Sequence, residues 1–62
     1  RMDRELRVRG WYRDWLWVNC APDGIRIGIK SGSEELYIIL PPKEARKVVK
    51  MMHTLLKGFE DV

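Results

Sequence analysis

The hydrophobic period of this chain changes once, at the proline pair Pro41-Pro42. Up to Leu40, apolar and polar side chains alternate with a period of two, which is typical of strands with one buried face. After Pro42, apolar residues recur with a spacing close to 3.6, which is typical of an amphipathic helix. Proline suits the first helical turn, where its missing N–H costs nothing. The sequence therefore predicts a sheet followed by one helix over about residues 42–58, with Gly58 closing the helix.

Three turn signals divide the first part of the chain into four predicted strands, at about residues 5–11, 15–20, 25–30 and 35–40. The turns at residues 21–24 and 31–34 contain glycine, and the first of them also contains proline and aspartate. The turn at residues 12–14 has no glycine, so a single bent strand over residues 5–20 is the alternative. The predicted fold is α+β. It is a four-stranded antiparallel meander with one amphipathic helix packed on one face, in a single domain over residues 1–62.

Strand register decides which side chains share a face, because a one-residue slip moves every side chain to the other side. A three-residue first loop pairs Val8 with Val18, and four-residue second and third loops pair Ile27 with Val18 and Ile38. A three-residue loop at Pro22–Gly24 is the alternative, and it would place the isoleucines of the third strand beside the tryptophans. The preferred register gathers one apolar face for the helix to cover, with Gly10 as a gap: Leu6, Val8, Leu16, Val18, Cys20, Ile25, Ile27, Ile29, Leu36, Ile38 and Leu40.

The opposite face combines aromatic and basic side chains, because indoles and guanidinium groups alternate in the stretch RVRGWYRDWLWVN over residues 7–19. Its predicted cross-strand pairs are Trp11 with Trp15, Arg9 with Trp17, and Gly28 with both Trp17 and Tyr37. Glu35 is the one carboxylate expected there. The predicted members of this face are Arg7, Arg9, Trp11, Trp15, Trp17, Asn19, Arg26, Gly28, Lys30, Glu35, Tyr37 and Ile39.

Aromatic and basic side chains on one face fit single-stranded nucleic acid. Unpaired bases stack on Trp and Tyr while Arg and Lys neutralise the phosphates, and a glycine between two aromatics allows close approach. The predicted binding residues are Arg7, Arg9, Trp11, Arg13, Trp15, Trp17, Asn19, Arg26, Lys30 and Tyr37. Aromatics and Arg are also enriched at protein interfaces, so a protein–protein interaction module is the alternative function. Plain packing of large strand residues is a third reading.

The shortness of the chain predicts self-association. A compact chain of 62 residues buries only about 60% of the surface that its unfolded form exposes, so its stability alone is marginal. A lone Cys20 allows no internal disulfide, and Cys20 with His53 is too small a set for a structural metal. We therefore expect a homodimer formed through one side of the helix, with the interface residues Val48, Met51, Met52, Leu55 and Phe59.

The sequence predicts no catalytic, metal or cofactor chemistry and no small-molecule substrate. His53 lies on a basic helical surface between Lys50 and Lys57, with no carboxylate one turn away to orient it as a base. Cys20 belongs to the apolar row, where a buried thiol is more common than a nucleophile. The formal net charge is +3, and no apolar run approaches the ~18 residues of a membrane span. We expect a cytoplasmic protein, or one associated with the nucleoid, without membrane contact.

The last predicted strand and the helix read LYIILPPKEARKVVKMMHTLL. Four antiparallel strands in a meander followed by this segment resemble the single-stranded-DNA-binding domain of the transcriptional positive cofactor 4 type coactivators, over about residues 5–58. The resemblance implies dimerisation through the helices and binding of unpaired DNA by the sheet, and DNA is therefore favoured, although the residues themselves fit single-stranded DNA and RNA alike. It also implies that the binding side chains of the sheet include Arg7, Arg9, Trp11, Trp15, Trp17, Arg26 and Lys30.

Overall fold

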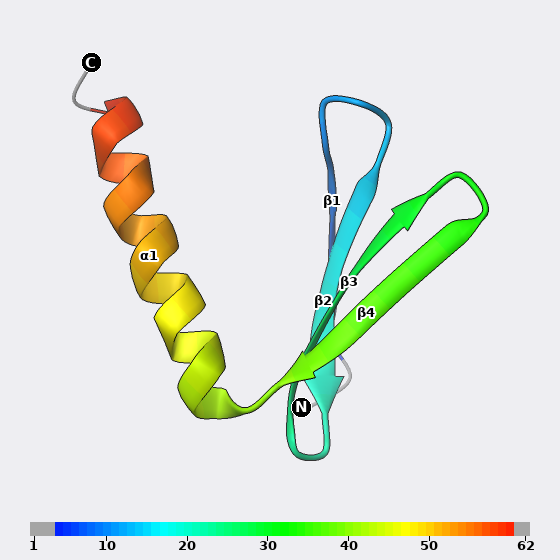
Figure 1. Cartoon of the computed structure of the whole chain (residues 1–62), viewed down its shortest axis with the longest axis horizontal. Coiled ribbons are helices and arrows are strands. Elements are labelled where there is room, and N and C mark those ends of the chain that lie inside the picture. Colours follow the sequence, from blue (N-terminus) through cyan, green and yellow to red (C-terminus); the bar gives the residue numbers. More distant parts are fainter. Residues whose placement is uncertain (1–3, 61–62) are drawn as a thin grey trace.

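A computed structural model of the chain describes residues 4–60 as four strands followed by one helix (Figure 1). The elements are β1 (Glu5–Arg9), β2 (Trp15–Ala21), β3 (Gly24–Ser31), β4 (Glu34–Leu40) and α1 (Pro42–Glu60). The strands form one antiparallel sheet in the order β1-β2-β3-β4. The predicted α+β meander with a C-terminal helix is therefore confirmed.

The register of the last three strands is the predicted one. Ile27 of β3 lies between Val18 of β2 and Ile38 of β4. The strands extend closer to their turns than predicted, which leaves residues 22–23 and 32–33 as the connections. The glycine of the second connection has a φ of 62°, in the left-handed region that glycine adopts at little cost. The alternative register, with isoleucines beside the tryptophans, is excluded.

The connection between β1 and β2 differs from the prediction. β1 ends at Arg9 rather than at Trp11, and residues 10–14 form the loop. The Gly10 N–H donates to the carbonyl oxygen of Asp14 at 2.7 Å and closes this loop. Arg13 has a φ of 71°, which is unusual for a residue with a side chain. The alternative of one bent strand over residues 5–20 is also wrong.

The longer loop moves the pairing of β1 with β2 by two residues. Val8 pairs with Leu16 instead of Val18, and Arg9 pairs with Trp15 instead of Trp17. Because side chains alternate with a period of two, a shift of two residues leaves every side chain on its predicted face. The predicted assignment of side chains to the two faces is therefore correct in the paired strands. The predicted cross-strand partners between β1 and β2 are wrong.

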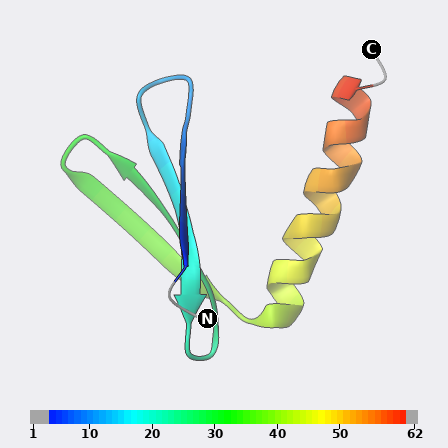
Figure 2. The same cartoon turned by 180° about the vertical axis from the view of Figure 1, so that it is seen from behind.

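Helix α1 lies on the apolar side of the sheet and packs against β3 and β4 at its first turns (Figures 1 and 2). Pro42 borders a hollow that Cys20 and Ile25 of the apolar face also line, and Ala45 is half-buried. Beyond these turns the helix diverges from the sheet in both views. It continues through Gly58 to Glu60, so the prediction that Gly58 ends it is wrong.

The helix covers less of the sheet than the sequence predicts. Within Pro42–Glu60, all of which the structure describes, no residue is buried. Five predicted members of the apolar face are exposed, namely Leu6, Val8, Ile29, Leu36 and Ile38. The other predicted side chains on β2, β3 and β4 are half-buried, namely Leu16, Val18, Cys20, Ile25, Ile27 and Leu40. The apolar face therefore has a partly protected end near α1 and an open remainder.

The tightest packing lies where β2 turns into β3. Ala21 and Gly24 are buried cross-strand partners at this end of the sheet. A Cβ on residue 24 would collide with the backbone of Leu40, the last residue of β4. Glycine is needed here because another strand passes too close for a side chain. This contact fixes the end of β4 just before the chain enters α1.

Candidate functional site

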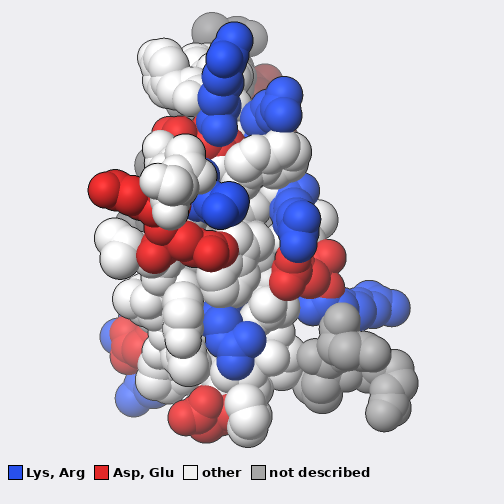
Figure 3. Space-filling view, turned by 90° about the vertical axis from the view of Figure 1, so that its right-hand side faces the viewer, with Lys and Arg blue, Asp and Glu red and all other residues white. Residues whose placement is uncertain are grey.

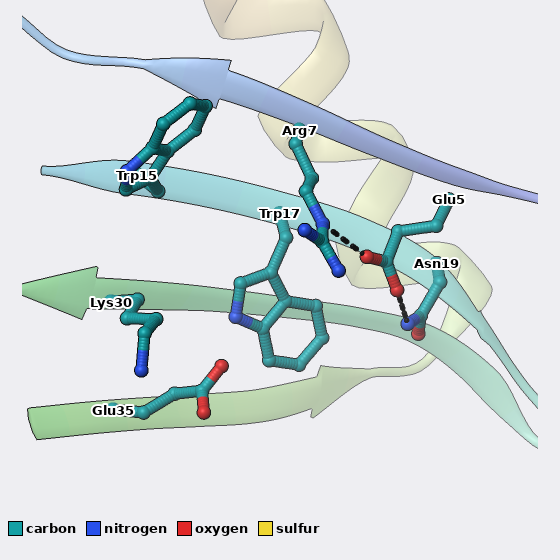
Figure 4. Close-up of a pocket in the computed structure, with 7 residues that line it drawn as sticks. All are labelled: Glu5, Arg7, Trp15, Trp17, Asn19, Lys30 and Glu35. Carbon is teal, nitrogen blue, oxygen red and sulfur yellow. Dashed lines mark hydrogen bonds and ion pairs between the residues drawn. The ribbon is translucent and has the colours of Figure 1, made fainter. Parts of the chain in front are cut away.

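The face of the sheet that points away from α1 carries most of the predicted binding residues. We call it the tryptophan face, and Figure 4 shows several of its side chains in front of the strands with the helix behind. By the strand register its members are Glu5, Arg7, Arg9, Trp15, Trp17, Asn19, Arg26, Gly28, Lys30, Glu35, Tyr37 and Ile39. Two predicted binding residues are not in strands: Trp11, which is 95% exposed, and Arg13 both lie in the loop between β1 and β2.

Trp17 lies at the centre of the tryptophan face. Its cross-strand partner is Gly28, and a Cβ on that residue would collide with the indole ring. The ring therefore rests on the backbone of β3, with one ring face covered and the other turned outward (Figure 4). Tyr37 follows on β4, with 5.7 Å between the ring centroids and an interplanar angle of 52°. The absence of a side chain at Gly28 is what allows the two aromatic residues to approach.

Two guanidinium groups lie against aromatic rings. The Cζ atom of Arg9 is 4.6 Å from the centroid of the Trp15 ring, and that of Arg26 is 5.8 Å from the centroid of Tyr37. Such cation–π contacts hold the cation near the ring by its attraction to the ring quadrupole. The N–H groups at the edge of a stacked guanidinium still have the planar geometry that suits phosphate oxygens. Aromatic and basic groups are thus neighbours in space as well as in the sequence.

A hydrogen-bonded chain links the first three strands on this face. Arg7 Nε donates to Glu5 Oε2 at 2.7 Å, and Asn19 Nδ2 donates to Glu5 Oε1 at 2.9 Å. Arg26 Nη1 donates in turn to Asn19 Oδ1 at 3.3 Å. The hydrogen bond from Arg7, followed by that from Asn19, lowers the pKa of Glu5 below its ordinary value of 4.5. The carboxylate is therefore ionised at neutral pH and orients two of the predicted binding residues.

Glu5 was not among the predicted members of this face. It has the same parity as Arg7 and Arg9 in a strand of period two, and this signal was sufficient to find it. With Glu5 and Glu35, the tryptophan face carries two carboxylates against four basic side chains, which are Arg7, Arg9, Arg26 and Lys30. The face is basic on balance, but less so than predicted.

The centre of the tryptophan face is hollowed. The hollow has a volume of about 410 Å³ and is lined by Glu5, Arg7, Trp15, Trp17, Asn19, Lys30 and Glu35. The indole Nε1 of Trp17 is buried and has no hydrogen-bond acceptor among the described residues. On the side of the molecule away from the helix, basic and acidic groups alternate with uncharged surface (Figure 3). The surface is thus a mixed aromatic and charged depression and not a continuous basic patch.

His53 and Cys20 lie apart from the tryptophan face. His53 is exposed on α1, and Cys20 is on the apolar side, where its Sγ lies 3.3 Å from the carbonyl oxygen of Ala21. Among residues 4–60 the structure holds no group of three His, Cys, Asp or Glu side chains placed to bind a metal ion. Within the same range, no helix has the length and apolar composition to cross a membrane.

Comparisons with known proteins found no relative of this chain. No protein-family model matches it, and the searches of curated proteins and of solved structures found no significant match. The resemblance to the positive cofactor 4 type domain stays a prediction, which rests on the order of four strands and one helix. The geometry of the tryptophan face is therefore the basis for inferring a function.

Proposed function

We propose that the tryptophan face binds single-stranded nucleic acid, without catalysis. The observation that supports this best is the position of Trp17, whose indole rests on Gly28 and turns its other ring face outward. An unpaired base could stack on that ring face without any rearrangement of the sheet. Stacking of this kind contributes ~1–3 kcal/mol per base and tolerates any base, because every base has a π face.

The charged groups around Trp17 are arranged as a bound strand would require. Arg7 and Arg26 lie on the strands to either side of Trp17, and the Glu5–Asn19 pair fixes both of them. Lys30 lines the same hollow at its other end. A phosphodiester chain that passes over the indole would therefore meet cations on both sides. DNA is proposed over RNA on the ground of the family resemblance.

Binding of a protein partner is the second candidate function. The two carboxylates of the tryptophan face, Glu5 and Glu35, favour it, because a surface of mixed charge suits a protein partner better than a polyanion does. Salt separates the two candidates. When phosphate contacts contribute to binding, the logarithm of the affinity falls linearly with the logarithm of the salt concentration, whereas the affinity of an aromatic protein interface depends on salt far less.

The proposal is tested by fluorescence polarisation with labelled single-stranded and duplex oligonucleotides at two salt concentrations. We expect preference for the single strand, weaker binding at higher salt, and quenching of indole emission on saturation. Trp17→Ala should weaken binding by ~1–3 kcal/mol. Arg9→Ala should weaken it less and should lower the salt slope by about one phosphate.

The matched controls are His53→Gln and Cys20→Ala, which lie away from the tryptophan face and should leave binding within a few-fold. All four variants should keep the helix and strand content seen in far-UV circular dichroism, because none alters a backbone constraint. Unchanged indole emission at saturating oligonucleotide would contradict the proposal. So would binding that does not respond to salt, and this result would favour a protein partner.

A further inference from the structure

Two apolar surfaces of the chain are uncovered and lie on the same side of the sheet. One is the open part of the apolar sheet face, where a hollow of about 280 Å³ lies among Leu16, Ile27, Ile29, Leu36 and Ile38. The other is the stripe of α1 that continues from the half-buried Ala45, and its members Val49, Met52, Leu56 and Phe59 are all exposed. These two surfaces border the open angle between the helix and the sheet (Figure 2).

The exposed area of the chain is too large for a compact monomer. The chain exposes 6047 Å², whereas a compact monomer of its mass, 7.4 kDa, exposes about 4,200 Å². The excess is about 1,800 Å². Each copy in an obligate homodimer buries about 1,000–2,500 Å² of its surface. The excess exposed area of this chain lies within that range, so one such interface would account for it.

We propose that a second copy of this chain fills the angle. The helix of each copy crosses to the apolar sheet face of the other, about a two-fold axis, so that the apolar stripe of one copy covers the open sheet face of its partner. The dimensions agree, because the 19 residues of α1 span about 28 Å and the strands of seven or eight residues span about 24–27 Å. A two-fold arrangement uses each surface twice and closes without leaving an open end.

The chemistry of the two surfaces favours a second copy over other occupants. Both are apolar, so two copies can cover these surfaces without any polar group that needs a partner. The outer side of α1 carries Lys43, Arg46, Lys47, Lys50 and Lys57, which stay in water in this arrangement. A basic amphipathic helix also suits an anionic membrane surface, but a membrane under α1 would leave the sheet face uncovered. The proposal does not depend on nucleic-acid binding, since it uses the opposite side of the sheet.

Sedimentation equilibrium of the unmodified protein should report twice the chain mass of 7.4 kDa. Leu36→Lys is the decisive variant, because Leu36 is 80% exposed in the single chain and a self-sufficient monomer would tolerate lysine there. We expect this variant to weaken self-association roughly 30-fold. Tyr12→Lys is the matched control. Tyr12 is 82% exposed in the loop between β1 and β2, outside both surfaces, and the variant should remain dimeric.

A second measurement on unmodified protein covers the case in which Leu36→Lys does not fold. In a mixture of ¹³C-labelled and unlabelled chains, isotope-filtered NOEs should join the Met52 methyl group of one copy to the Leu36 and Ile38 methyl groups of the other. A folded monomer at micromolar concentration would overturn the proposal, and so would intermolecular NOEs confined to the tryptophan face. A monomer whose helix is ordered only on anionic phospholipid vesicles would also overturn it, in favour of a membrane surface.

Discussion

On the tryptophan face, the side chains are held by contacts with other residues of the same chain. Trp17 rests on Gly28, Arg9 lies against the Trp15 ring, and Glu5 holds Arg7. On the apolar face, leucine and isoleucine side chains at the far end of β3 and β4 touch little beyond their neighbours in the sheet and remain exposed. A polar and aromatic surface can be organised by directional contacts alone, because each hydrogen bond or ring contact has a fixed geometry. An aliphatic surface has no such contacts and is stabilised only when something removes it from water.

The two faces also differ in which of their residues are buried. In most small domains the helix covers the sheet, and the opposite face of the sheet is exposed. Here five of the eleven side chains of the apolar face, on the helix side, are also exposed, and the tryptophan face holds the buried Gly28 and the half-buried Trp17. The apolar face indicates where assembly should occur, and the tryptophan face indicates where a ligand of mixed aromatic and ionic character would bind.

Two neighbouring isoleucines of β4 test the contrast directly. Ile38 belongs to the apolar face and is 58% exposed, whereas Ile39 belongs to the tryptophan face and is 42% exposed. The single chain alone therefore predicts a greater cost for Ile39→Ala. If a second copy covers the apolar face, Ile38→Ala should lower the free energy of unfolding by ~2–3 kcal/mol and Ile39→Ala by ~1 kcal/mol. Urea denaturation at equal protein concentration measures both, and the reverse order would mean that the apolar face stays in water.

Gly28 tests whether the tryptophan face depends on contacts within the chain. Gly28→Ala should lift the Trp17 ring off β3, because the added Cβ and the ring cannot occupy the same space. We expect weaker single-strand binding by ~1–3 kcal/mol, about the contribution of one stacked base, and a shifted indole emission maximum. Gly58→Ala is the matched control, since nothing lies within 4 Å of a Cβ there. It should stabilise the helix by ~0.5–1 kcal/mol and leave binding unchanged. Equal binding by both glycine variants would show that Trp17 is not the stacking platform.

Glu5 gives the smallest expected effect and tests the hydrogen-bonded chain. The folded state lowers the pKa of Glu5, so this carboxylate contributes stability above its unfolded pKa, and the contribution is lost as the pH falls through the folded pKa. The carboxyl resonance of Glu5 followed by NMR should titrate below 4.5 in the unmodified protein, and Arg7→Ala should move the pKa of Glu5 back toward that value. Glu5→Gln should tighten single-strand binding a few-fold at low salt, because it removes a negative charge and releases Arg7. Weaker binding by Glu5→Gln would mean that the orientation of Arg7 by Glu5 contributes more to binding than the loss of the negative charge of Glu5 does.

The register of β2, β3 and β4 could be predicted because one arrangement alone gathers the isoleucines and valines on one face. The pairing of β1 with β2 could not, since its loop depends on the positive φ of Arg13. Arginine gives no sequence signal for that conformation, whereas glycine or asparagine would have done so. The position of Trp17 beside Gly28 followed from the register and was predicted. The partner of Arg9 depended on the β1 pairing and was predicted wrongly.

The extent to which the helix covers the sheet was the largest difference from expectation. The spacing of Val49, Met52 and Leu56 shows which side of α1 avoids water, but it does not show what covers that side. A chain that packs on itself and a chain that packs on its copy have the same hydrophobic pattern. Their difference lies in the angle at which the chain leaves Pro41-Pro42, and that angle depends on long-range packing.

β4 is an outer strand of the sheet, so the backbone groups along its free side have no strand neighbour among residues 4–60. Its sequence ELYIIL combines high β propensity with few charges, which is the composition that favours open-ended strand addition and fibril growth. The chain limits this hazard at both ends of the strand. Glu34 and Glu35 repel a second strand that enters in register, and Pro41-Pro42 offers no N–H to extend a ladder. The residues that end the strand and begin the helix thus also protect the protein from aggregation.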